Sequence, residues 1–145
     1  MKKIVALSFC LLMAITLWAQ KTTKTVPVEP ILKEVFDEQR LLDYQTLSPS
    51  KLLELNYQAT HYCYVTDEMP ANAQVLGNLI PSPNTTYEPE KISSEKSINP
   101  FKFAFVQDKS HYNVYTIPNS NLFVVVYPFD EYLQGKIEYF KQYGY

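Results

Sequence analysis

Three short runs rich in aromatic and β-branched residues, closely spaced near the end of the chain, constrain its fold more than any other feature. They are FKFAFVQ at 101–107, HYNVYTI at 111–117 and LFVVVYP at 122–128. The segments DKS and PNSN between them are good turn formers. Pro118 and Pro128 close the second and third runs, where a missing backbone donor matters least. The pattern predicts a three-stranded antiparallel meander.

An amphipathic helix is expected directly after the third run. Phe129, Leu133, Ile137 and Phe140 fall on one narrow arc at helical spacing, which is typical of a helix with one buried face. Asp130 is a suitable N-cap for this helix. Because a helix that follows a meander buries its apolar face on it, we expect these four side chains to pack on the sheet.

Two further helices are predicted near the beginning of the folded region. The first covers about 29–44, with Pro30 at the first helical position, where its missing N–H costs nothing. The second begins at Pro49, with Ser48 as its N-cap, and ends near Ala59. A short connection between two helices indicates an antiparallel helical hairpin.

Two more segments complete the predicted fold. Aromatic and β-branched residues from His61 to Thr66 favour a strand, and the apolar stretch 75–80 is a candidate short strand. The predicted fold class is α+β: an N-terminal helical hairpin, a small antiparallel sheet with a three-stranded C-terminal meander, and a C-terminal amphipathic helix packed on the sheet.

The first 19 residues have the layout of a secretory signal peptide. Lys2 and Lys3 precede the uncharged apolar run 4–17, and Ala19 offers a small residue for cleavage. The run is shorter than the roughly 20 residues that a bilayer-spanning helix needs. We therefore expect export to the periplasm or the extracellular space after cleavage near Ala19, with an uncleaved N-terminal membrane anchor as the alternative.

The exported chain is expected to contain three parts. Residues 20–28 are polar and read as a flexible tether, and residues 29–145 form a single small α+β domain. Within that domain, the proline-rich and polar stretch at about 81–99 is too long for an ordinary connection. We expect it to be a mobile excursion.

Few residues are available for catalysis. After removal of the signal peptide, Cys63 is the one remaining cysteine, and the chain holds only two histidines, His61 and His111. A cysteine-dependent hydrolase using Cys63 with either histidine is therefore the alternative function. In a strand, His61 and Cys63 would lie about 6.5–7 Å apart, which is long for a hydrogen bond. A small thiol packed among aromatic residues is the simpler interpretation.

Other chemistries find no support in the sequence. Zinc sites normally use paired short ligand spacings, which this chain lacks, so no metal site is predicted. With only 3 glycines, phosphate-binding loops have no material, and no cofactor is expected. A net charge of −2 also argues against a nucleic-acid partner.

The tyrosine content is the compositional feature that points to a function. The chain has 12 tyrosines, and tyrosine combines an apolar ring with a polar tip that suits binding surfaces. Tyr132, Tyr139 and Tyr143 flank the apolar arc of the last helix and are the candidate binding residues, although packing at the edge of the core is the simpler interpretation of these side chains. The sequence thus predicts a small exported, non-catalytic module that contacts a protein partner or a small ligand in the cell envelope.

Overall fold

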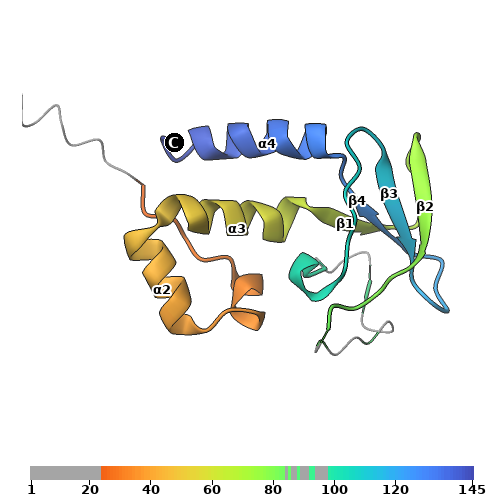
Figure 1. Cartoon of the computed structure of the whole chain (residues 1–145), viewed down its shortest axis with the longest axis horizontal. Helices are drawn as coiled ribbons and strands as arrows, with labels where there is room; N and C mark the ends of the chain where they lie inside the picture. Colours follow the sequence, from red (N-terminus) through yellow and green to blue (C-terminus); the bar gives the residue numbers. More distant parts are fainter. Residues whose placement is uncertain (1–23, 84, 86–87, 89–91, 94–97) are drawn as a thin grey trace, which may run out of the picture.

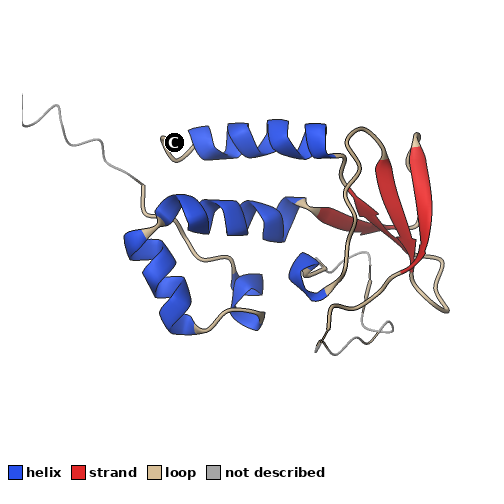
Figure 2. Ribbon diagram, viewed as in Figure 1, coloured by secondary structure: helices blue, strands red, loops and turns tan. Residues whose placement is uncertain are grey.

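The computed structural model describes residues 24–83, 85, 88, 92–93 and 98–145. Its elements, in chain order, are η1 (Pro30–Glu34), α2 (Glu38–Leu47), α3 (Pro49–His61), β1 (Cys63–Thr66), β2 (Ala73–Asn78), η3 (Pro100–Lys102), β3 (Tyr112–Thr116), β4 (Phe123–Val126) and α4 (Phe129–Lys141). Figure 1 shows α3 and α4 lying side by side, with the sheet at one end of the pair. Helices and sheet occupy separate parts of the molecule (Figure 2), so the predicted α+β class is confirmed.

The sheet is mixed rather than wholly antiparallel as predicted. Its strand order is β1-β4-β3-β2. β4 pairs antiparallel with both β1 and β3, whereas β2 pairs parallel with β3. Parallel neighbours need a long connection between them, and the chain from 79 to 111 supplies it. The predicted strand at 75–80 corresponds to β2, which begins two residues earlier.

The run 101–107 is not the first strand of a meander. It begins with η3 and continues as an extended segment whose Phe103 and Phe105 pack against the apolar cluster on one face of the sheet. Its backbone at 102 and 104 pairs with the backbone of residues 82 and 80. At Val106 the partners are side chains of β3: the Val106 N–H donates to the Tyr115 hydroxyl, and the Val106 carbonyl accepts from Asn113 Nδ2, both at 2.8 Å. The alternating phenylalanines therefore cover the sheet instead of extending it.

The first predicted helix is interrupted. Residues 30–34 form a 3₁₀ helix, and α2 begins only at Glu38 because the Asp37 carboxylate accepts a 2.8 Å hydrogen bond from the Arg40 backbone N–H. A side chain that caps in this way favours a helix start over helix continuation. α3 and β1 lie within two residues of the predicted helix end and strand start.

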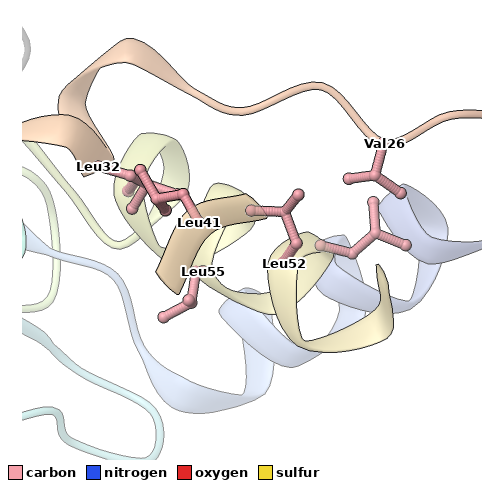
Figure 3. Close-up of a cluster of buried hydrophobic side chains, with 7 residues drawn as sticks. Val26, Leu32, Leu41, Leu52 and Leu55 are labelled. Carbon is pink, nitrogen blue, oxygen red and sulfur yellow. The ribbon is translucent and has the colours of Figure 1, made fainter. Parts of the chain in front are cut away.

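α2 and α3 form a helical corner rather than the predicted antiparallel hairpin. Only Ser48 separates the two helices, and Figure 1 shows α2 turning steeply away from the axis of α3. One residue is too little chain to reverse direction and bring two helix faces together. The corner instead encloses buried leucines from both helices (Figure 3).

The described part of the predicted tether, residues 24–28, is docked on the helices. Val26 is only 2% exposed and belongs to the helical core. The Val26 carbonyl accepts from Gln45 Nε2 at 2.8 Å, and the Pro27 carbonyl accepts from the buried Asn56 Nδ2 at 2.7 Å. The tether 20–28 was predicted because most of its residues are polar. The prediction is wrong for residues 24–28, because Val26 is buried in the helical core.

Two apolar clusters hold most of the buried apolar side chains among the described residues. The helical cluster contains Val26, Leu32, Leu41, Leu52, Leu53, Leu55 and Ala59 (Figure 3). The sheet cluster contains Leu79, Ile98, Tyr115, Ile117, Val124 and Val126. Two clusters arise because α3 continues into β1, so the helices gather around α3 at one end while the sheet is covered separately by the segment 98–105.

α4 packs on α3 and not on the sheet, contrary to the prediction. Tyr139, Phe140 and Tyr143 pack against the helical cluster. Phe129, Leu133 and Ile137, which were expected to be buried, are instead 46%, 39% and 49% exposed. The first turn of α4 is held by the loop before β3, whose carbonyls at 108 and 109 accept from the N–H groups of residues 129 and 130. This anchor directs the helix away from the sheet.

Gly135 explains which face of α4 meets α3. A Cβ at this position would lie 2.1 Å from the Tyr57 hydroxyl oxygen, so the glycine provides a notch for the Tyr57 side chain. Tyr57 is only 5% exposed, and Tyr132 and Tyr139 lie on either side of it, with ring centroids 5.0 and 5.3 Å away. Tyr132 and Tyr139 of α4, and Tyr143 just after it, therefore face α3 and the helical cluster. The apolar arc of Phe129, Leu133 and Ile137 is rotated toward solvent.

The predicted signal peptide 1–19 and residues 20–23 of the predicted tether lie outside the described residues, as does much of the stretch 81–99. At the end of that stretch Ile98 and Asn99 are buried, and Asn99 Nδ2 donates to the Ile31 carbonyl at 3.1 Å. Among the described residues, no helix combines the length and the apolar character that crossing a bilayer requires.

Replacing Gly135 with alanine is expected to destabilise the protein, even though alanine is the better helix former by about 1 kcal/mol. The added methyl group would overlap the Tyr57 hydroxyl, whose packed ring has little room to move. In a Tyr57→Phe background the oxygen is gone, so the same substitution should be neutral or stabilising. Urea unfolding of the four proteins in this cycle measures the coupling. Equal effects of Gly135→Ala in both backgrounds would contradict the notch.

Candidate functional site

A pocket of about 180 Å³ lies where the end of α3, the start of α4 and the residue after β4 meet. Its lining residues are Tyr57, His61, Tyr127, Glu131, Tyr132 and Gly135. Tyr57 and His61 are one helical turn apart on α3, so both side chains reach the same surface. Glu131 and Tyr132 come from the first turn of α4. The sheet contributes Tyr127, whose N–H is fixed by a hydrogen bond to the Tyr62 carbonyl.

Aromatic rings form most of the pocket wall and hold one another in place. His61 stacks on Tyr57 with ring centroids 4.4 Å apart and planes inclined by only 9°. Tyr132 is tilted by 52° relative to Tyr57 and meets Tyr62 edge-on at 5.6 Å. Rings packed in this way have few alternative rotamers, so the pocket wall is largely pre-formed.

A second group of tyrosine rings, from the sheet, lies next to the pocket residue Tyr127. Tyr127 lies 5.1 Å from Tyr64 and 6.1 Å from Tyr112 between ring centroids. The Tyr112 hydroxyl donates a 2.5 Å hydrogen bond to Glu131 Oε2. This bond holds the Glu131 carboxylate at the edge of the pocket, between the sheet and α4.

The tyrosine hydroxyls of the site are kept protonated by their surroundings. The hydrogen bond to Glu131 raises the pKa of Tyr112 to about 12. Burial raises the pKa of Tyr132 and of Tyr57, and the nearby Glu131 charge also contributes at Tyr57. Both causes disfavour a phenolate, because burial and a neighbouring carboxylate each penalise another negative charge.

Of the three tyrosines predicted to bind, the structure places Tyr132 in the pocket. Tyr139 and Tyr143 pack against the helical cluster beside it, with ring centroids 5.4 Å apart. They support the α3–α4 contact, and burial raises the pKa of Tyr139 to about 12.

Sequence reasoning missed Tyr57, Tyr127 and Glu131 as pocket residues. The spacing of Tyr57 and His61 within one helix was an available signal, because it places two aromatic side chains on one surface. The joining of Tyr127 to this pair is a tertiary contact between distant segments, and no local pattern indicates it.

Cys63 and the two histidines have separate surroundings. The Cys63 side chain packs against the sheet cluster, and burial raises the pKa of its thiol to about 12. The hydrogen-bond partner of His61 Nδ1 is Thr60 Oγ1, at 2.7 Å. His111 Nδ1 lies 3.1 Å from Asp108 Oδ1, in the loop before β3. The candidate catalytic residues are therefore not joined by any hydrogen bond among the described residues.

Metal ligation also lacks an assembled set of side chains. Within the described ranges, no group of three or more histidine, cysteine, aspartate or glutamate side chains is close enough to hold a metal ion. The acidic residues near the pocket are instead spread along α3 and α4. The polar groups in the pocket lining are the tyrosine hydroxyls, the His61 imidazole and the Glu131 carboxylate.

The Cys63 thiol is expected to be unreactive in the folded protein. A pKa of about 12 leaves it protonated at pH 8, and the thiolate is the nucleophile. In a Cys10→Ser variant, where Cys63 is the only thiol, a disulfide reagent should react at least about 100-fold more slowly with folded than with urea-unfolded protein. Equally fast reaction of both forms would contradict this and favour the cysteine-dependent alternative.

The comparison with known proteins identifies no relative. No protein-family model matches the chain, and neither the curated proteins nor the solved structures contain a match. The function is therefore argued from the residues of the chain and their arrangement.

Proposed function

We propose that this protein is a small exported, non-catalytic module that acts in the cell envelope by contact with a protein or a small ligand. The observation that carries the proposal is the pocket at the junction of α3, α4 and β4, where tyrosine rings and one carboxylate meet. Concave sites with aromatic walls and a few polar groups are the usual form of binding sites. We assign the contact to this pocket, which Tyr132 helps to line.

The rigidity of the pocket supports a binding role. Tyr57 is fixed between α3 and Gly135, and His61, Tyr132 and Tyr139 surround its ring. A partner that meets such a surface need not order loose side chains, and ordering each one costs about 0.5–1.5 kcal/mol. Tyr57 and Tyr132 thus serve both helix packing and recognition.

Export is supported by the sequence of residues 1–19. The basic Lys2 and Lys3, the uncharged run that follows and Ala19 are the features that signal peptidase substrates share. The contact would then take place outside the cytoplasm, in the envelope or beyond it.

Export is expected to leave a chain that begins at Gln20. Because Trp18 is the only tryptophan of the sequence, the exported protein should show tyrosine fluorescence without a tryptophan component. Intact-mass measurement of protein from the envelope fraction and from whole cells checks this. An envelope protein with the intact N-terminus would instead support the membrane-anchor alternative.

A photo-crosslinking residue at position 134 is expected to capture the partner in the producing cells. Gln134 is exposed and three residues after Glu131, so the probe lies beside the pocket without replacing its lining. The same probe at Asp43, exposed on α2, is the matched control. A band of higher mass on a denaturing gel would reveal a crosslinked protein partner. An increase in intact mass would reveal a crosslinked small ligand. Identical products from both positions, or a product that Tyr132→Leu does not reduce, would contradict the assignment.

A further inference from the structure

The pocket has a distinct electrostatic character, and the following inference about its ligand rests on the proposed function. Glu131 is exposed at its edge, and its lining contains no lysine or arginine. Lys136 is the first lysine of α4 and follows the lining residue Gly135. Its Nζ is paired with Glu54 Oε1 at 2.8 Å. Within the described residues, no salt bridge involves Glu131, whose hydrogen-bond partner is the Tyr112 hydroxyl.

The position of Glu131 favours a fixed negative charge. It lies in the first turn of α4, where the helix dipole stabilises a carboxylate. The Tyr112 hydroxyl holds one of its oxygens, which limits the directions in which the side chain can turn. The charge therefore stays beside the aromatic wall.

The aromatic wall adds to this potential. The face of a tyrosine ring carries partial negative charge, and cations are attracted to such faces within about 6 Å of the ring centre. His61 covers one face of Tyr57, so Tyr127 and Tyr132 are the rings left to meet a ligand. The raised pKa values of Tyr57, Tyr64, Tyr112 and Tyr127, to each of which the Glu131 charge contributes, are consistent with a negative potential across the site.

The size of the pocket restricts what can enter. Its volume of about 180 Å³ is below the roughly 300–1,000 Å³ of pockets that enclose a whole drug-sized ligand. A single headgroup or one side-chain end fits this volume, and the remainder of the ligand would stay outside.

We propose that the pocket binds one organic cationic group, an alkylammonium or a guanidinium, with its charge facing Glu131 and its carbon or planar surface against the rings of Tyr127 and Tyr132. Such a group can belong to a small free cation or to a lysine or arginine side chain of a protein. In both cases the recognition chemistry is the same.

The test is an NMR titration of isotope-labelled full-length protein that follows the amide signals of His61, Glu131 and Gly135. One arm uses choline and its uncharged isostere 3,3-dimethylbutan-1-ol. The other uses the blocked amino acids Nα-acetyl-lysine methylamide and Nα-acetyl-arginine methylamide, with the norleucine analogue as the uncharged control. Each probe is added to the wild type, to Glu131→Gln and to the matched surface variant Glu138→Gln, whose carboxylate pairs with Lys141 away from the pocket.

The charged probes are expected to bind more tightly than their uncharged counterparts by about 3- to 30-fold, the range that cation–π attraction and one carboxylate supply. Glu131→Gln should remove most of that preference, and Glu138→Gln should retain it. Preference for choline would identify a free cation as the ligand, and preference for the blocked lysine or arginine would identify a protein side chain.

Equal binding of charged and uncharged probes, a preference that survives Glu131→Gln, or no shift of the pocket signals with any cation would overturn the proposal. The proposed contact function is tested separately, because crosslinking at position 134 does not depend on the charge of the ligand. A crosslinked product together with failed cation binding would refute the cation and leave the contact surface in place.

Discussion

The contact between Tyr57 and Gly135 determines the position of α4, and much of the structure depends on it. A tyrosine from α3 fits a notch that only glycine leaves open, since a Cβ there would lie 2.1 Å from the hydroxyl oxygen. This contact turns Tyr132 and Tyr139 of α4 toward α3 and leaves Leu133 and Ile137 partly exposed. Glycine weakens a helix by about 1 kcal/mol relative to alanine, and the burial of Tyr57 offsets that cost.

The same contact creates the pocket. With α4 held against α3, Glu131 and Tyr132 lie next to His61 at the end of α3, and β4 delivers Tyr127 to the same place. Tyr112 then reaches across from β3 to Glu131. The side chains that pack the helices are thus continuous with those that line the pocket, so helix packing and the proposed binding site share one aromatic surface. Cys63, on the other side of β1 from Tyr64, belongs to the sheet cluster and has no part in this surface.

Hydrogen-bonding side chains account for the other departures from simple sequence patterns. Asp37 ends the first helical stretch by capping α2. Asn56 pairs with the extended chain before η1 through both ends of its amide, and so converts an apparently loose segment into part of the helical core. Tyr115 and Asn113 satisfy the backbone at Val106 and thereby allow the run 101–107 to cross the sheet without joining it. In each case polar side chains supply hydrogen bonds in place of regular backbone pairing.

Local patterns in the sequence determined the α+β class, α3, α4 and the pairing of β3 with β4, because helical spacing, strand alternation and short turns act within a few residues. They also singled out Tyr132, which lines the pocket. The parallel pairing of β2, the docking of Val26 and the union of Tyr57, Tyr127 and Glu131 were decided only by the tertiary structure. The apolar arc of α4 shows the reason: Phe129, Leu133 and Ile137 are the most hydrophobic choice for burial, but the shape of the Tyr57–Gly135 contact outweighs hydrophobicity in selecting the buried face.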